Sequence, residues 1–462
     1  MNLKEVAWQE RYKAAYVYTL FYTIADSPNV LAKMLEAVGA CKANIDDIST
    51  IGVDGDQKLQ KMNIYCTSPA HMKSVTEAIE KISGIKISEI RDEVLEIHRR
   101  GAIKICSRVP IASLTDLRML YTPGVAAMCE RIVEDRTIAW EITGICDRVA
   151  IVTNGTAVLG LGDIGTLASL PVMEGKAAIF AEFAGISAEP VLVNSKDIDT
   201  VVETVVRISE SFGAIQLEDI AAPECFAIEE KLRDRLDIPV FHDDQHGTAT
   251  VLLASLINAL KHTGKRAGDC SALILGAGAA GIAIAKTLLN FGLGDIVVYD
   301  SFGPIYRGRN EKMNPYTSQL AQITNKHNQT CSLEDGFNGK DIFIGVARPK
   351  MVTGKLIASM AKNPIVFPLS NPVGEITVEE AIASGAAIAA DGRTVNNALA
   401  YPALFRGALD AEATDITFEM QLAAAQELAD LAKGSNLLPD ILDLNVHKKV
   451  AQKVFEAWKN SL

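Results

Sequence analysis

The alternation of apolar and polar positions over residues 16–96 predicts a small unit built from strands and two helices. Period-two alternation, which is typical of strands, occupies YVYTLFYTIA, ISTIGVDGDQKLQKMNIYCT and IKISEIRDEVLEI, and the second of these predicts a hairpin that turns at Gly55. Helical periodicity occupies NVLAKMLEAVGACKA and HMKSVTEAIEKI. The resulting order, βαββαβ, is that of a ferredoxin-like unit.

From Ile111 onward, short apolar runs alternate with helical stretches, which predicts an α/β architecture. Four of these runs predict buried strands: AAIFAEF, EPVLVN, AIQLED and IPVFHDD. The stretch GTATVLLASLINALKHTG predicts a long helix that starts near Thr248, and CSALILGAGAAGIAIAKTLLNFG opens a further unit. A chain of 462 residues is too long for one ordinary core, so we expect two or three domains. The changes of pattern along the chain favour three, over residues 1–97, 98–247 and 248–462.

Composition and charge narrow the class of protein. The formal net charge of −12, with no dense cluster of lysine and arginine, argues against nucleic acid and against an anionic membrane as partners. No stretch is apolar enough to span a bilayer, and the N-terminus lacks the apolar core of a signal peptide. The eight cysteines are scattered without a C-x-x-C pair. We therefore expect a cytoplasmic protein.

The spacing G-x-G-x-x-G occurs twice, over residues 160–165 and 276–281. After the first copy, Pro171 and Gly175 leave no room for a helix and a returning strand, so we expect a turn built for close backbone approach. The second copy follows the strand SALIL, opens a helix and leads to the strand DIVVYD, which is the context of a dinucleotide site. The backbone expected to bind a pyrophosphate is that of Gly276, Ala277, Gly278, Ala279, Ala280 and Gly281.

Asp300, the last residue of DIVVYD, lies 19 positions after Gly281. Its carboxylate would accept hydrogen bonds from ribose hydroxyls and repel a 2′-phosphate. NAD is therefore favoured as the cofactor. Arg307 and Arg309 lie close enough in sequence to keep NADP open.

Two apolar strands end in adjacent carboxylates, Glu218 and Asp219 after AIQL and Asp243 and Asp244 after IPVFH. The helical run between them makes the strands parallel, so both acidic ends emerge at the same edge of the sheet. Ligands bind at such edges, and converging carboxylates repel one another unless a cation lies between them. Oxygen ligands select a hard ion, Mg²⁺ or Mn²⁺.

His242 and His246 are four positions apart, which is the spacing of a zinc-binding helix. A helix that includes both is not expected, because the strand-like IPVF precedes His242 and Gly247 directly follows His246. The glutamate of the H-E-x-x-H motif is also replaced, by Asp243. We interpret the histidines as packing residues or as neighbours of the ion's ligands.

The segment IADSPNVLAKML resembles the strand, turn and helix of the ACT regulatory family, with Asn29 in place of the family's usual glycine. The resemblance implies that residues 1–97 form an ACT-like regulatory domain that binds a small-metabolite effector. A dimerisation module without a ligand is the alternative.

Four further segments, LRMLYTPGVA, VLGLGDIGTLASLPVMEGKAAIFAEFAGI, PLSNPVGEIT and VNNALAYPALFRGAL, resemble malic enzymes of the small bacterial type, in the family's order. The resemblance covers about residues 105–462. It implies a malic enzyme N-terminal domain with catalytic and metal residues at 98–247, and a Rossmann NAD-binding domain with C-terminal helices at 248–462.

The resemblance also implies roles for individual residues. Tyr121 corresponds to the family's acid, Lys176 to its base and Asp243 to the aspartate beside that lysine. The residues that match the metal ligands are Glu218, Asp219 and Asp244. The residues that match the asparagines that hold the substrate carboxylate are Asn371 and Asn397, with Asn396 adjacent.

The implied reaction is the oxidative decarboxylation of (S)-malate to pyruvate and CO₂ with reduction of NAD. Lys176, held near neutrality by a cation and by burial, takes the C2 hydroxyl proton as hydride leaves, and Tyr121 protonates C3. Malolactic decarboxylation to lactate and an ACT-regulated amino-acid dehydrogenase remain enzymatic alternatives. A metabolite sensor with an inactive core is the non-catalytic alternative, against which the intact Tyr121 and Lys176 argue. We expect a homo-oligomer, a dimer or larger.

Overall fold

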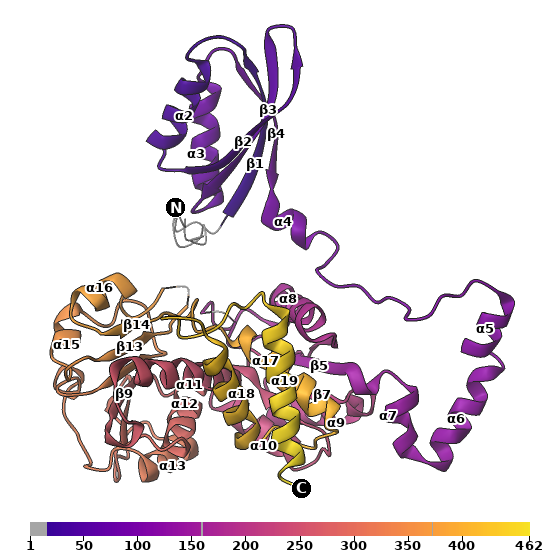
Figure 1. The fold of residues 1–462 in the computed structure, drawn as a ribbon, viewed down its shortest axis with the longest axis vertical. Coiled ribbons are helices and arrows are strands. Elements are labelled where there is room, and N and C mark those ends of the chain that lie inside the picture. Colours follow the sequence, from indigo (N-terminus) through magenta and orange to yellow (C-terminus); the bar gives the residue numbers. More distant parts are fainter. Residues whose placement is uncertain (1–15, 159, 372) are drawn as a thin grey trace. The chain divides into compact units, whose positions relative to one another are not determined.

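The structure is a computed structural model that describes residues 16–158, 160–371 and 373–462 (Figure 1). The chain divides into two compact units, Met1–Lys104 and Ile105–Leu462. In the part of the chain that the structure describes, no helix combines the length and the apolar character needed to cross a bilayer. A further domain boundary after residue 247 stays a prediction.

The N-terminal unit is an antiparallel sheet with two helices on one face (Figure 1). Its elements are β1 (Tyr16–Ala25), α2 (Val30–Ala40), β2 (Asn44–Asp54), β3 (Gln57–Cys66), α3 (Pro69–Glu80), β4 (Ile85–Asp92) and the short α4 (Glu93–His98). The strand order is β2-β3-β1-β4, and side chains such as Leu20, Met34, Met62 and Val75 form the core. The predicted order βαββαβ and the hairpin turn at Gly55 are confirmed.

Asn29, just before α2, has a φ of 70°, in the left-handed region of backbone conformations. Glycine favours this region, and asparagine tolerates it better than most other residues because its short polar side chain bonds locally. Asn29 therefore keeps the backbone conformation that a glycine would adopt at this turn. The neighbouring Asp26 pairs with Lys58 of β3 at 2.6 Å.

The larger unit contains two sheets, of which the first is four-stranded and parallel, in the order β6-β5-β7-β8. Its strands are β5 (Arg148–Thr153), β6 (Ser187–Leu192), β7 (Ala214–Leu217) and β8 (Val240–His242). The connecting helices are α8 (Thr166–Ala184), α9 (Ile198–Ile208) and α10 (Glu224–Arg233), and α11 (Asp243–Thr263) follows β8. Since β7 and β8 are parallel neighbours, the prediction that both acidic pairs emerge at one edge is confirmed.

Three predictions about elements in this region are wrong. The first is the strand predicted at AAIFAEF, which belongs to the helix α8. The second is that Pro171 and Gly175 leave no room for a helix, because α8 starts directly after Gly165 and contains Pro171. Its buried side chains Met173, Ala177 and Phe180 lie on one helical face, and this packing outweighs the local preferences of Pro171. The central strand of the sheet is instead RVAIVT, which forms β5.

The third wrong prediction concerns the start of α11, which begins at Asp243 and not near Thr248. Gly247 lies within its first turns, and a Cβ atom there would collide with the carboxylate of Asp243. Glycine at this position thus makes room for the buried acid. His242 precedes the helix and His246 lies inside it, so the two rings do not share a helical face.

The second sheet has six strands in the order β11-β10-β9-β12-β13-β14, with β11 alone antiparallel to its neighbour. The strands are β9 (Ser271–Leu275), β10 (Asp295–Asp300), β11 (Gly303–Pro304), β12 (Ile342–Gly345), β13 (Ile365–Pro368) and β14 (Ile388–Ala389). The helices of this part are α12 (Ala279–Asn290), α13 (Pro315–Ile323), α14 (Leu333–Gly336), α15 (Gly354–Ala358) and α16 (Val378–Ala383). The predicted sequence of strand, glycine loop, helix and strand is confirmed in β9, α12 and β10.

The C-terminal helices return to the first sheet (Figure 1). They are α17 (Tyr401–Asp410), α18 (Phe418–Leu431) and α19 (Leu444–Lys459), preceded by the short turn η5 (Asn397–Leu399). Phe180 of α8 packs edge-on against Tyr401 and Phe405 of α17, with ring centroids 4.9 and 5.3 Å apart. The end of the chain therefore becomes part of the core beside α8.

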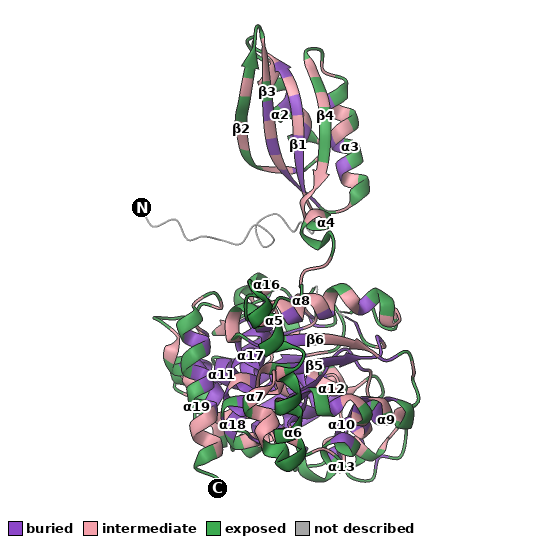
Figure 2. Cartoon of the chain, turned by 90° about the vertical axis from the view of Figure 1, so that its right-hand side faces the viewer, coloured by how far each residue is buried: buried purple, intermediate pink, exposed green. Residues whose placement is uncertain are grey.

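A helical hairpin at the start of the larger unit projects from its body (Figure 1), and its residues are mostly exposed (Figure 2). It consists of α5 (Leu114–Leu120) and α6 (Gly124–Glu134), and α7 (Ala139–Ile142) leads back to the sheet. All residues of α5 and α6 are described, and none of them is buried. Leu114, Met119 and Val133 are 72%, 64% and 85% exposed, so the hairpin carries uncovered apolar surface.

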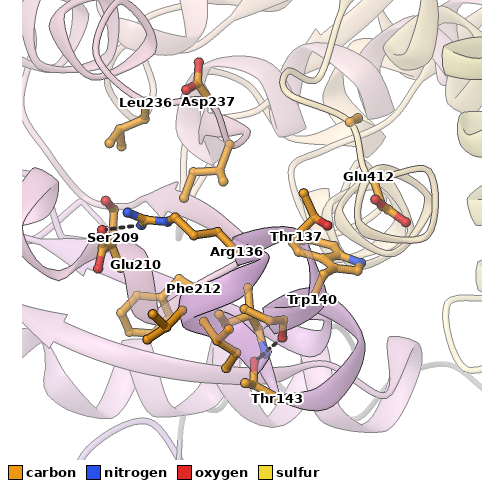
Figure 3. A pocket seen from close by; sticks show the side chains of 17 residues that line it. Arg136, Thr137, Trp140, Thr143, Ser209, Glu210, Phe212, Leu236, Asp237 and Glu412 are labelled. Carbon is orange, nitrogen blue, oxygen red and sulfur yellow. Dashed lines mark hydrogen bonds and ion pairs between the residues drawn. The ribbon is translucent and has the colours of Figure 1, made fainter. Parts of the chain in front are cut away.

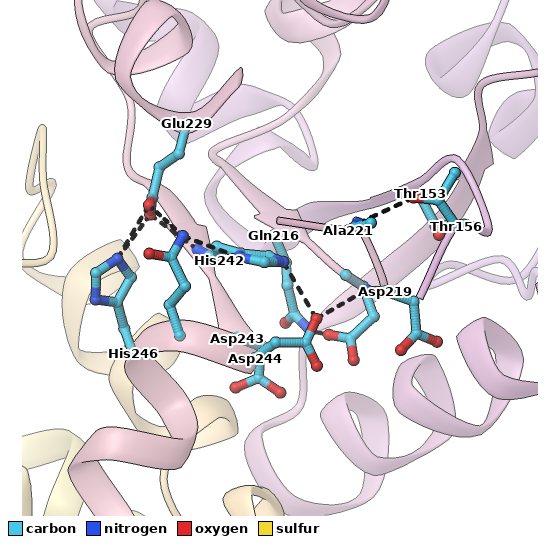
Figure 4. Close-up of polar contacts among 12 residues, drawn as sticks. Thr153, Thr156, Gln216, Asp219, Ala221, Glu229, His242, Asp243, Asp244 and His246 are labelled. Atoms are coloured by element: carbon cyan, nitrogen blue, oxygen red, sulfur yellow. Dashed lines mark hydrogen bonds and ion pairs between the residues drawn. The ribbon is translucent and has the colours of Figure 1, made fainter. Parts of the chain in front are cut away.

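A buried carboxylate joins α10 to the start of α11 (Figure 4). Glu229 accepts hydrogen bonds from the backbone N–H of His242 at 3.1 Å and from the side-chain amide of Gln245 at 2.8 Å, and it contacts His246 Nε2 at 2.9 Å. Burial by itself raises the pKa of Glu229, but the facing His246 and His242 outweigh burial and lower this pKa to about 2. The ionised carboxylate thereby anchors the first turn of α11.

Glu229 should make the fold sensitive to acid. Because its pKa is lowered from 4.5 to about 2 on folding, its stabilisation is complete above the ordinary value and is lost as the pH falls toward 2. The shift corresponds to roughly 3 kcal/mol of unfolding free energy over this window. In urea unfolding between about pH 5.5 and pH 3, Glu229→Gln should lose less stability than the unmodified protein; equal losses would contradict the assignment.

Candidate active site

Carboxylates from two strand ends converge at the carboxyl edge of the first sheet (Figure 4). Glu218 and Asp219 follow β7 and Asp244 lies in the first turn of α11, and one oxygen of each lies within 4.8 Å of the others. Glu218 and Asp219 are buried. A set of three carboxylates offers only oxygen donors at this spacing, which fits Mg²⁺ or Mn²⁺ and not zinc.

Lys176 of α8 reaches the same edge. Its ammonium lies 2.6 Å from Glu218 Oε1, forms a short ion pair with Asp243, and lies 4.8 Å from the centre of the Tyr401 ring. Burial lowers the pKa of Lys176, but Asp243 and Glu218 outweigh it and raise this pKa well above its ordinary value. The near-neutral lysine expected from sequence therefore requires a cation among these carboxylates, since the described residues alone keep the ammonium charged.

The two adjacent asparagines have different contacts. Asn397 donates a hydrogen bond from Nδ2 to Asp243 Oδ2 at 2.6 Å, so it lies beside the lysine. Asn396 instead accepts a hydrogen bond from the backbone N–H of Ala398 at 2.9 Å and caps the turn η5. Asn397 is thus the residue that the structure brings to the Lys176 cluster.

Asn371 follows β13, on the second sheet, and lies against the glycine loop of the first. A Cβ atom on Gly160 would come within 2.7 Å of the Asn371 carbonyl oxygen, so the expectation of close backbone approach is confirmed there. A Cβ atom on Gly392 would lie 3.1 Å from Asn371 Oδ1. Glycines on two segments therefore leave the space that Asn371 occupies.

Glu375 is a residue that the sequence reasoning missed. It is fully buried and accepts hydrogen bonds from the backbone N–H of Ala347 at 2.8 Å and from the hydroxyl of Ser370. A Cβ atom on Gly345 would collide with its carboxyl group. Glu375 thus ties the loop after β12 to the loop after β13, which carries Asn371. Its acidic side chain within the apolar segment PLSNPVGEIT was the available indication.

Tyr401 was also missed. It is 1% exposed, its ring supports the Lys176 ammonium, and its hydroxyl has no hydrogen-bond partner among the described residues. An aromatic face attracts a cation through its quadrupole. Tyr401 therefore adds an aromatic contact to the ion pairs that hold Lys176. In the sequence, the one indication that Tyr401 lies near the site is its position four residues after Asn397.

The glycine segment 276–281 contains the short loop between β9 and α12 and the first turn of α12. Gly276 has a φ of 120°, and a Cβ atom on it would lie 2.6 Å from the Val346 carbonyl oxygen. A Cβ atom on Gly281 would collide with the Gly276 carbonyl. The helix begins at Ala279, so Ala277 and Gly278 belong to the loop, and Ala280 and Gly281 lie in the first turn of α12. The first N–H groups of a helix have no partner within the helix and favour an anion.

Asp300 ends β10 and forms a pair with Arg309. Two hydrogen bonds of 2.9 and 2.7 Å join the guanidinium to the Asp300 carboxylate, and Arg309 also donates to the carbonyl of Pro304 at 3.1 Å. Arg307 donates to the carbonyl of Gln322 at 2.9 Å. Both arginines are bonded to protein groups, which weakens the argument that either contacts a 2′-phosphate.

Tyr121 lies apart from these residues. It ends α5 in the projecting hairpin, and it is 67% exposed. The structure of the single chain therefore brings together Lys176, Asp243, Asn397 and the carboxylates, but it does not bring Tyr121 to them.

A cavity of about 950 Å³ lies elsewhere (Figure 3). Its lining includes Arg136, Trp140, Glu210, Phe212 and Asp237. Residues 209–213 precede β7 and residues 236–238 precede β8, so the cavity lies at the amino ends of strands whose carboxyl ends carry the acidic pairs. None of the predicted site residues lines it.

Comparison with known proteins agrees with this geometry. Two family descriptions match the chain: "Malic enzyme, N-terminal domain" over residues 101–233 and "Malic enzyme, NAD binding domain" over residues 245–458. An NAD-dependent malic enzyme of Geobacillus stearothermophilus is 42% identical over 431 residues, which cover 91% of this chain and 90% of that protein.

Two further relatives extend the comparison. A bifunctional malic/malolactic enzyme of Bacillus subtilis is 46% identical over 376 residues, which cover 80% of this chain and 92% of that protein. The crystal structure of an NAD-dependent malic enzyme from Thermotoga maritima, 39% identical, superposes with a TM-score of 0.76 over 78% of this chain and 98% of its own. Because the two family descriptions together span most of the sequence, and a relative 42% identical is matched over 91% of it, the chain belongs to the malic enzyme family.

Proposed function

We propose that this chain catalyses the oxidative decarboxylation of (S)-malate to pyruvate and CO₂, with NAD as the hydride acceptor. The observation that carries the proposal is the position of Lys176 between Asp243 and Glu218 at the ligand-binding edge of the sheet. The ion, Mg²⁺ or Mn²⁺, would be held by Glu218, Asp219 and Asp244. When bound, it would supply Lewis acidity toward the substrate's C2 oxygen and its carboxylate.

The chain's own residues position the substrate and move protons. Lys176 Nζ accepts the proton of the C2 hydroxyl while the hydride leaves C2, and Asp243 holds the ammonium that results. Glu218 would be both a ligand of the ion and a counter-charge of Lys176, so a bound ion would weaken the charge pairing that raises the pKa of Lys176 in this structure. Asn371 and Asn397 orient the substrate carboxylate, and Tyr121 returns a proton to C3.

The reaction and its metal can be tested together. Malate should yield NADH with Mn²⁺, less NADPH, and no product in EDTA, and Lys176→Ala should lower kcat by about 10²- to 10⁴-fold. Lys261→Ala, at an exposed lysine paired with Asp430, is the matched control and should keep full activity. Lactate without released NADH would favour the malolactic alternative, and full activity in EDTA would favour metal-free amino-acid dehydrogenase chemistry.

We also propose that the enzyme is a homo-oligomer, a dimer or larger, in which the α5–α6 hairpin packs on a second copy. Two observations support this: the hairpin has exposed apolar side chains and no buried residue, and Tyr121 at the end of α5 lies apart from Lys176. A surface of this kind is usually covered in an assembly. Tyr121 would then complete the active site of a partner.

Mixing two inactive variants tests whether sites are shared. Tyr121→Phe and Lys176→Ala should each be nearly inactive, and coexpression with different tags should restore about a quarter of the activity, because half of random dimers would carry one intact site. Isolated heterodimers without activity would contradict a shared site, and a monomer in light scattering would contradict the assembly itself.

For the N-terminal unit we propose an ACT-like regulatory role with an amino acid or a related small metabolite as effector. The βαββαβ order and the Asp26–Asn29 turn, with its glycine-like backbone, support the proposal. We also propose a cytoplasmic location, with no nucleic acid or membrane partner. All eight cysteines lie within the described residues and form no disulfide, which agrees with a reducing compartment.

Removal of the N-terminal unit tests this role. A variant that starts at Ile105, the first residue of the larger compact unit, should keep malate oxidation but lose any response to amino acids that change the activity of the full chain. Parallel assays with a panel of amino acids measure the response. The same response in both proteins would rule out an effector site in this unit.

A further inference from the structure

We infer that His242 is a positioning residue that holds one oxygen of Asp244 and thereby turns the other toward the ion; this inference rests on the proposed metal site. His242 is fully buried at the end of β8 and belongs to a chain of side chains that runs from Glu229 through Gln245 to Asp244 (Figure 4). The two histidines with the spacing of a zinc site thus contact carboxylates instead: His242 lies beside Asp244, and His246 beside Glu229.

The Glu229 carboxylate determines where the protons lie in this chain of contacts, because it can only accept hydrogen bonds. The amide nitrogen of Gln245 lies 2.8 Å from Glu229 Oε2 and 2.9 Å from His242 Nδ1. An amide NH₂ group has two hydrogens, and the opposite amide orientation would place oxygen against a carboxylate. Gln245 therefore donates to both neighbours, His242 Nδ1 accepts, and the ring carries its proton on Nε2.

The protonated nitrogen of His242 faces Asp244. His242 Nε2 lies 3.1 Å from Asp244 Oδ2, and the same oxygen accepts a hydrogen bond from the backbone N–H of Asp219 at 2.9 Å. Oδ2 thus accepts one backbone hydrogen bond and has His242 Nε2 beside it at ion-pair distance, and no described residue donates a hydrogen bond to Oδ1. The carboxylate is fixed with Oδ1 as the oxygen that is left for a ligand role.

The surroundings make this arrangement specific. Glu229, Gln245 and His242 are 6%, 4% and 0% exposed, so water does not replace a lost contact easily. Without His242, only the backbone N–H of Asp219 would hold Asp244, and its partly exposed side chain would keep less of the fixed geometry that a divalent ion requires. Mutation of a residue that orients a metal ligand typically lowers metal affinity by about 10- to 100-fold.

Direct Mn²⁺ binding to the full-length protein, without malate or nucleotide, tests the inference by calorimetry. His242→Leu removes the donor and should weaken Mn²⁺ binding by about 10- to 100-fold. His242→Gln places an amide N–H near the former Nε2 and should restore binding to within a few-fold of the unmodified protein. Equal weakening in both variants, or unchanged binding in His242→Leu, would overturn the inference.

Two further variants separate this inference from the metal site itself. Asp244→Asn should weaken Mn²⁺ binding whether or not His242 matters; if it does not, the proposed metal site fails. Circular dichroism shows whether His242→Leu folds. If it does not, Gln245→Leu replaces it in the test: this variant keeps the ring but removes the donor to Nδ1, and it should also weaken Mn²⁺ binding. Unchanged Mn²⁺ affinity in a folded Gln245→Leu would count against the inference.

Discussion

The buried ion pair of Lys176 with Asp243 and Glu218 is the constraint on which the active site depends. Removing charges from water costs several kcal/mol per ion, so each of these groups is tolerated only because the others are placed beside it. With Asp219 and Asp244, four carboxylates face one lysine, and this excess of negative charge is what a divalent cation would neutralise.

Much of the surrounding fold serves to deliver these groups. Gly247 leaves room for the Asp243 carboxylate inside the first turns of α11, and Glu229 fixes that turn from α10. The Tyr401 ring, supported by Phe180, covers the ammonium of Lys176. The C-terminal helices are therefore part of the catalytic half of the molecule, although they follow the nucleotide-binding sheet in sequence.

The sequence predicted the features that are local. Strand ends rich in carboxylates, the glycine loop before α12 and the βαββαβ order were all found, because each depends on periodicity or spacing within one segment. The errors arose where packing outweighed local preference. α8 continues through Pro171 because its Met173, Ala177 and Phe180 face is buried, and α11 begins early because Glu229 binds its first turn.

The sequence by itself therefore determined the chemical groups available: the acidic pairs, the lysine, the asparagines and the glycine loop, with Asp300 beyond it. Tertiary structure alone decided which of them meet. Lys176 and Asp243 are 67 positions apart, and Asn397 and Asp243 are 154 apart. It also decided that Asn396 is only a cap and that Arg309 binds Asp300. The physical reason is that such contacts depend on how distant segments pack, which no local pattern of residues specifies.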